Sequence, residues 1–154
     1  MSRLFVVLGL LMWPMMSSAT DGVAMTPVER WQADHSVVFS ADEVHIEDFR
    51  WIARPVIVFG DSEYDPRFVQ QMALIEALPE ELAERDVVII TDTDPAAKSE
   101  ARTEYRPRSF MMVLVGKDGS VYLRKPFPWD VRELSRSIDK LPLRQQEVRD
   151  RRGE

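Results

Sequence analysis

Five carboxylates lie in two short loops of this sequence, and each loop directly follows a run of apolar residues. They are Asp61, Glu63, Asp65, Asp92 and Asp94. Clustered carboxylate oxygens are the ligands that Mg²⁺ and Ca²⁺ prefer. A bound cation could support phosphoryl or ester hydrolysis, with Arg106 and Arg108 holding an anionic substrate. One hypothesis is therefore a hydrolase that depends on a divalent cation held by Asp61, Glu63 and Asp92.

Two of these carboxylates also have a structural explanation. Asp65 and Asp94 each precede a proline. An aspartate followed by proline is typical of a helix start, where the carboxylate caps the first N–H groups and proline takes the first helical position. The nearby arginines would then neutralise the acidic loops. Because exposed carboxylates are common at loop tips, the cation-dependent enzyme is the alternative rather than the main hypothesis.

The other common catalytic constellations are absent from the sequence. There is no cysteine, so no thiolate nucleophile can form. The two histidines, His35 and His45, have no cysteine or third histidine with which to complete a zinc site. Ser62 does not lie in a Gly-x-Ser-x-Gly motif, and there is no glycine-rich phosphate loop. The sequence therefore predicts no catalytic residue and no cofactor.

The acidic loops each join a predicted strand to a predicted helix. The β-branched run at 56–59 predicts a buried strand, and apolar residues at helical spacing predict a helix over 66–78. The same order of strand, acidic loop and helix is predicted again, with a strand over 86–91 and a helix after Pro95. Since a helical crossover normally joins parallel neighbours, we expect both acidic loops at one edge of a sheet.

The second half of the chain predicts a hairpin and a final helix. Strand-like runs at 110–115 and 121–124 flank Asp118-Gly119, a strong hairpin signal, and apolar spacing predicts a helix over 130–141. The predicted order is β-α-β-α-β-β-α, an α/β fold with a mixed four-stranded sheet flanked by helices. Its third strand should run antiparallel to the first. In the preceding segment, SVVF predicts an extra strand and DEVHIEDFRW a short helix.

The amino terminus predicts a secretory signal peptide. A single Arg3 precedes an apolar run, a proline and small residues, so we expect cleavage before Thr20, with Ala24 as the second choice. The run is about half of the roughly 20 apolar residues that span a membrane. We expect a periplasmic or secreted protein with no transmembrane segment after cleavage. The predicted parts are a signal peptide over 1–19, an N-terminal extension over 20–48, a domain over 49–147 and a solvated charged tail over 148–154.

Charge and cysteine content limit the partners and the source of stability. The 154 residues carry a net charge of −6, and acidic residues outnumber basic ones before residue 101, with the reverse after it. The acidic half argues against nucleic acid as a partner. Without cysteine no disulfide can form, even in an oxidising compartment, so the fold must be stabilised by packing alone.

Three stretches of the chain resemble a known family: FRWIARPVIVF, LVGKDGSVYLR and IDKLPLRQQE. They are similar to thioredoxin-like domains of exported bacterial proteins, domain of unknown function 4174. Related domains occur in animal extracellular proteins with sushi repeats or a coiled-coil-domain name. The resemblance covers 49–147. It implies a thioredoxin-like or peroxiredoxin-like fold and an exported location, and it implies no activity.

Compared with the cysteine-glycine-proline-cysteine site of thioredoxin, this chain keeps the proline and lacks both sulfurs. The corresponding residues are Tyr64, Asp65, Pro66 and Arg67. Thiol-disulfide exchange and peroxide reduction are therefore excluded. Met111 stands where thioredoxins have a cis-proline that seats a peptide, which puts that mode of binding in doubt. We expect a non-catalytic module that binds another exported protein or peptide, with contacts at Tyr64, Asp65, Arg67 and Arg108.

Overall fold

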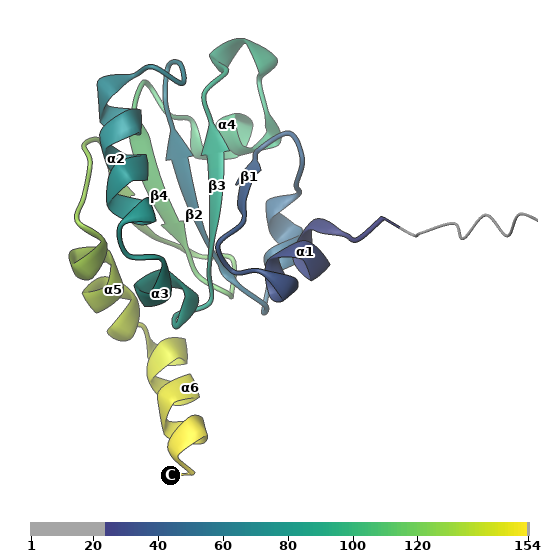
Figure 1. The fold of residues 1–154 in the computed structure, drawn as a ribbon, viewed down its shortest axis with the longest axis vertical. Helices are drawn as coiled ribbons and strands as arrows, with labels where there is room; N and C mark the ends of the chain where they lie inside the picture. Colours follow the sequence, from purple (N-terminus) through teal and green to yellow (C-terminus); the bar gives the residue numbers. More distant parts are fainter. Residues whose placement is uncertain (1–23, 154) are drawn as a thin grey trace, which may run out of the picture.

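A five-stranded mixed sheet lies between two layers of helices in the computed structural model, which describes residues 24–153 (Figure 1). The strand order is β1-β3-β2-β4-β5. The strands are β1 (Val38–Ser40), β2 (Arg54–Phe59), β3 (Val87–Asp92), β4 (Met111–Val115) and β5 (Val121–Lys125). The helices are α1 (Pro27–Ala33), η1 (Ile46–Phe49), α2 (Pro66–Glu76), α3 (Pro79–Ala83), η2 (Pro95–Ala97), α4 (Glu100–Tyr105), α5 (Val131–Asp139) and α6 (Pro142–Arg152). The signal peptide and its cleavage position lie outside the described residues.

Strand β2 is the centre of the sheet. All six of its residues are buried, as its continuous apolar sequence predicts for a strand covered on both faces. Val56 lies beside Ile89 of β3 in a parallel pair and beside Leu114 of β4 in an antiparallel pair. The predicted parallel start and the predicted antiparallel third strand are both confirmed.

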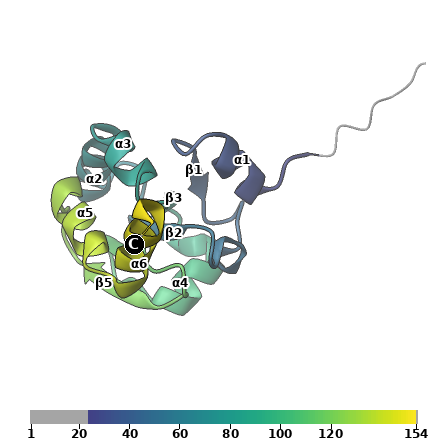
Figure 2. The same cartoon turned by 90° about the horizontal axis from the view of Figure 1, so that it is seen from below.

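Side chains that alternate along β2 enter two separate cores. Ile57 and Phe59 point to the core beneath α1, η1 and α4, whereas Val56 and Val58 point to the core beneath α2, α3 and α5. The two views of the ribbon agree that these helix groups lie on opposite faces of the sheet (Figure 2). Each core has a helix layer of its own, which fixes the register of the central strands.

The sheet has five strands rather than the four of the predicted domain, because the N-terminal extension supplies an edge strand. The extra strand expected from SVVF is present as β1, where Phe39 lies beside Ile90 of β3. The short helix expected over DEVHIEDFRW is present as η1. Trp31 of α1 is buried, and its Nε1 donates to the backbone oxygen of Val87 at 3.2 Å. The extension therefore shares the sheet and the core of the rest of the chain.

The single helix predicted after Pro95 is wrong, because the chain turns within it. Lys98 adopts a left-handed conformation with φ of 49°, which ends the short η2. Ser99 then caps α4 by accepting a hydrogen bond from the backbone N–H of Arg102. The predicted helix over 66–78 is confirmed as α2, although it ends two residues earlier.

The charged tail expected over 148–154 is helical up to Arg152, where α6 ends, and residues 149–153 are exposed to solvent. The helix predicted over 130–141 ends at Asp139, and Pro142 starts α6 as the first helical residue. Figure 1 shows α6 projecting from the body of the domain below α3 and α5. Three basic residues lie in the last turn of α6, where the negative end of the helix dipole stabilises cations.

Within residues 24–153, no helix is both long enough and apolar enough to cross a lipid bilayer.

Buried ion pairs attach α6 to the sheet. Arg54, at the start of β2, is fully buried and donates from Nη2 to Oε2 of Glu147 at 2.9 Å. Lys117 contacts the other oxygen of Glu147 at 3.0 Å. Burial alone would raise the pKa of Glu147, but hydrogen bonds from Lys117 and Arg54 hold it below its ordinary value. Glu147 therefore links α6 to two cations of the domain.

We predict that Glu147→Gln destabilises the protein by about 3 kcal/mol at pH 7, because it leaves buried Arg54 without its closest carboxylate. Since the pKa of Glu147 is lowered by folding, its contribution is present above the ordinary value of 4.5 and is lost as the pH falls through the folded value. Urea unfolding at a series of pH values should therefore show the wild type and the variant converging in acid.

Glu133→Gln is the matched control, because it breaks an exposed pair with Arg136 on α5. That change should alter the free energy of unfolding by less than about 0.5 kcal/mol. Equal effects of the two substitutions, or a difference that does not depend on pH, would contradict the role assigned to Glu147.

Candidate functional site

The two acidic loops lie side by side at the carboxyl ends of β2 and β3, as the sequence predicts. Phe59 and Asp92 are register partners at the last position of the parallel pair. The backbone N–H of Gly60 donates to the backbone oxygen of Asp92 at 2.9 Å, which continues the ladder into the loops. This edge is where open α/β sheets usually bind ligands, so its side chains define the candidate site.

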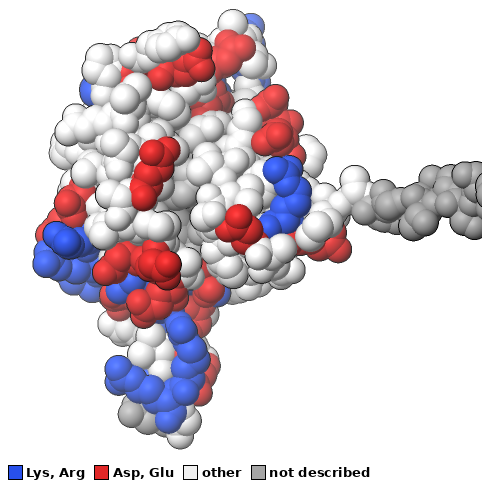
Figure 3. Space-filling model, viewed as in Figure 1, with Lys and Arg blue, Asp and Glu red and all other residues white. Residues whose placement is uncertain are grey.

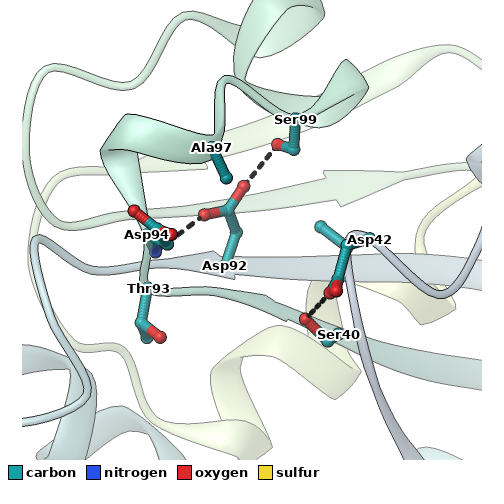
Figure 4. Close-up of a pocket in the computed structure, with 8 residues that line it drawn as sticks. Ser40, Asp42, Asp92, Thr93, Asp94, Ala97 and Ser99 are labelled. Atoms are coloured by element: carbon teal, nitrogen blue, oxygen red, sulfur yellow. Dashed lines mark hydrogen bonds between the residues drawn. The ribbon is translucent and has the colours of Figure 1, made fainter.

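Asp92 is held by a buried arginine that the sequence analysis did not single out. Arg102 of α4 donates from Nε to Oδ1 of Asp92 at 2.7 Å, and its Nη2 donates to the backbone oxygen of Gly60 at 2.7 Å. The side chains of Asp92 and Arg102 are only 4% and 10% exposed. The hydroxyl of Ser99 donates to the second carboxylate oxygen of Asp92 (Figure 4). Both oxygens of Asp92 are therefore engaged within the protein.

A small polar pocket opens beside this ion pair, between the ends of β1 and β3. Its volume is about 200 Å³, and its lining includes Asp42, Asp92 and Asp94 (Figure 4). Asp42 accepts a hydrogen bond from Ser40, and Asp94 accepts one from the backbone N–H of Ala96 at 2.9 Å. The predicted helix cap at Asp94 is thus present, although the helix that it starts is the short η2. The acidic lining is engaged in loop structure.

A second hydrogen-bonded group joins the loop after β2 to the loop before β4. The hydroxyl of Ser109 donates to Asp61, and the same hydroxyl accepts from Nη2 of Arg67 at 2.8 Å. The guanidinium of Arg67 also lies 5.7 Å from the ring centroid of Phe110. Asp61, predicted as a metal ligand, and Arg67, predicted as a contact residue, therefore meet at one serine.

Asp65 caps α2, as predicted. It is 8% exposed and accepts from the backbone N–H of Arg67 at 2.9 Å. Burial would raise the pKa of Asp65, but hydrogen bonds from the backbone and side chain of Arg67 hold it below its ordinary value. Of the four predicted contact residues, Asp65 therefore uses its carboxylate to cap α2.

Tyr64 and Arg108 are the two predicted contact residues that remain most open. Tyr64 is 80% exposed, more than any other large hydrophobic residue of the described chain. A hydrogen bond with Glu63 raises the pKa of the Tyr64 hydroxyl. Arg108 is exposed in the loop that carries Ser109. The candidate site is thus an exposed tyrosine beside two loops that are joined by hydrogen bonds.

The geometry does not favour a cation at the three carboxylates predicted for it. Asp92 is buried against Arg102, Asp61 accepts from Ser109, and Glu63 is exposed beside Tyr64. Among residues 24–153, no group of three or more histidine and acidic side chains is placed to hold a metal ion.

We predict that millimolar Mg²⁺, Ca²⁺ or Mn²⁺ changes the melting temperature by less than about 1 °C relative to protein in a chelator. A cation bound only by the native state would raise it by mass action. An increase of several degrees that Asp61→Asn abolishes would contradict this and support the cation-dependent hydrolase.

The chain was compared with known protein families, curated proteins and solved structures. The family model described as domain of unknown function (DUF4174) matches residues 45–147, and no curated protein matches the chain. The reduced 2-Cys peroxiredoxin of Plasmodium vivax has a similar fold, with a TM-score of 0.55 and 13% identity over 69% of this chain and 90% of that one. Thioredoxin peroxidase I of Plasmodium yoelii has a TM-score of 0.50 and 16% identity over 74% of this chain and 86% of that one.

These identities are low enough that the likeness shows the fold alone. No peptide bond among the described residues is cis, so the chain leading into β4 at Met111 differs from the cis-proline of thioredoxins. The fold is thioredoxin-like, and no cysteine is present. The chain belongs to the family described as domain of unknown function (DUF4174).

Proposed function

We propose that this protein is an exported, non-catalytic module that binds another exported protein or peptide through the position where thioredoxins carry their redox cysteines. The observation that carries the proposal is the exposure of the Tyr64 side chain on a hydrogen-bonded loop. Its side chain is 80% exposed, yet it stands on a loop that is hydrogen-bonded on both sides. An aromatic residue held in this way suits a binding anchor rather than a core position.

The order of the loop supports binding because it lowers the entropic cost of association. Asp61 on one side of Tyr64 is joined through Ser109 to Arg67 on the other side. Asp65 holds the backbone of the first turn of α2. A partner would therefore meet a surface that is already arranged, and little free energy would be spent on ordering it.

The charges around Tyr64 define the chemistry of the partner. Glu63 is exposed next to the ring, and Arg108 is exposed in the facing loop. An apolar or aromatic side chain on the partner would pack on Tyr64, and a neighbouring basic group would pair with Glu63. Arg108 would select a carboxylate farther along the same segment.

Export is part of the same proposal. Its basis is the predicted leader with cleavage before Thr20. The mature protein would act in the periplasm or outside the cell, where its partner would also be exported.

Site-specific photocrosslinking in intact host cells tests this proposal. The full chain is expressed with Tyr64→p-benzoylphenylalanine, and the matched control carries Tyr122→p-benzoylphenylalanine. Tyr122 is 42% exposed at the start of β5, at the opposite end of the sheet. We expect a discrete adduct at position 64 and none of that mass at position 122. Mass spectrometry of the adduct should read a mature chain that begins at Thr20.

Competition separates specific binding from chance collision. Excess wild-type protein added to permeabilised cells should suppress the adduct, whereas excess Tyr64→Ala protein should not, since loss of an aromatic anchor typically weakens binding by tenfold or more. The binding proposal is refuted if the two positions crosslink alike or both competitors act equally. An adduct on an unprocessed cytoplasmic chain would refute export alone.

A further inference from the structure

A cleft lies between α6 and the turn that connects α3 to β3, far from the loops described above. Its volume is about 420 Å³. Figure 3 shows basic side chains gathered along α6 below an acidic area at α3. Four arginines and two carboxylates line it: Arg85, Arg144, Arg149, Arg152, Glu84 and Asp139. Arg149 and Arg152 are three residues apart, so they lie on the same face of α6.

Arg144 is a buried cation without good partners in this cleft. Its side chain is 3% exposed, and its two nearest carboxylates, Glu84 and Asp139, each lie at 3.5 Å. Its Nη1 atom is buried without a hydrogen-bond partner and is 3.9 Å from the nearest oxygen of Glu147. A buried guanidinium normally satisfies its donors, because an unpaired buried donor is costly. Arg144 is therefore a buried cation at the wall of the cleft whose carboxylate neighbours all lie at 3.5 Å or farther.

The charges of the lining leave a positive excess. Arg85 forms two hydrogen bonds with Asp139, at 3.0 and 2.8 Å, and a third at 3.0 Å with Glu81 outside the lining, so the charge of Arg85 is compensated. Glu84 is 62% exposed at the rim and is shared between Arg85 and Arg144. Neither Arg149 nor Arg152 forms an ion pair with another residue of the described chain. With Glu84 set against Arg144, two positive charges remain uncompensated.

We propose that this cleft binds a phosphate monoester group, either free or on a lipid headgroup, through Arg144, Arg149 and Arg152. A phosphate monoester carries a charge of about −1.5 to −2 at pH 7, which matches the excess. Guanidinium groups present pairs of N–H donors that fit phosphate oxygens. A single carboxylate would leave one charge unbalanced. The site is independent of the proposed binding of a protein at Tyr64.

Thermal unfolding of the mature chain in phosphate tests the site. Protein in about 20 mM sodium phosphate is compared with protein in sodium chloride of equal ionic strength and pH. We expect phosphate to raise the melting temperature of the wild type by about 3 °C, because the native state alone binds it. The double variant Arg149→Gln, Arg152→Gln should lose this increase. Arg151→Gln, on the same helix but outside the lining, should keep it.

Vesicles distinguish the two sources of the phosphate group. Phosphatidylcholine vesicles with and without phosphatidate are sedimented with the wild type and both variants. Binding that needs phosphatidate, fails in the double variant and persists in Arg151→Gln assigns the site to a lipid headgroup. Phosphate stabilisation without vesicle binding assigns it to a free monoester. The proposal is overturned if phosphate acts no better than chloride, or if Arg151→Gln weakens the effect as much as the double variant does.

Discussion

The guanidinium group of Arg102 joins the carboxyl ends of the two central parallel strands. Arg102 contacts the backbone oxygen at the end of β2, the carboxylate at the end of β3 and, through the adjacent cap, the start of α4. It also lies 5.5 Å from the ring centroid of Phe59, at the rim of one core. Because a buried ion pair is costly to break from one side, this contact holds two strands and a helix in a fixed relation. Asp92 and Asp94 at this edge therefore have structural roles, whereas Glu63 stays exposed.

The junction between β2 and α2, which we align with the redox site of thioredoxins, is likewise held by polar side chains. The thioredoxin-like fold places the start of a helix directly after the central strand, where a thiolate would be stabilised by the helix N-terminus. Here Asp65 takes the first N–H groups of α2, and Arg67 is turned toward Ser109. The loop keeps its shape through polar side chains rather than through sulfur chemistry. Among Tyr64, Asp65, Pro66 and Arg67 only Asp65 is buried, and the proposed function rests on the exposed ring of Tyr64.

The parts of the fold that local patterns specify were predictable, and the parts that depend on distant partners were not. Runs such as VIVF and VVII, the Asp-Pro caps and the Asp-Gly turn each act over a few residues, so the strands, α2 and the hairpin follow from sequence. Arg102 meets Asp92 only because the chain turns at Lys98, which no local pattern indicates. Helix α6 is polar on most sides, and it is attached by ion pairs with Arg54 and Lys117 that are remote in sequence. Tyr64, Asp65 and Arg67 were predicted as contacts by their position alone, whereas the hydrogen bonds of Asp65 and Arg67 required the structure.

We propose that the junction at the start of α2, directly after the central strand β2, has the position of a thioredoxin-type redox site without its sulfur atoms. The most direct test is the double variant Tyr64→Cys, Arg67→Cys, whose two positions are three residues apart at a helix start. We expect a folded protein that closes an internal disulfide on oxidation, with a loss of about 2 Da, and reopens it with dithiothreitol. A folded variant that keeps two free thiols under the same oxidant would contradict it.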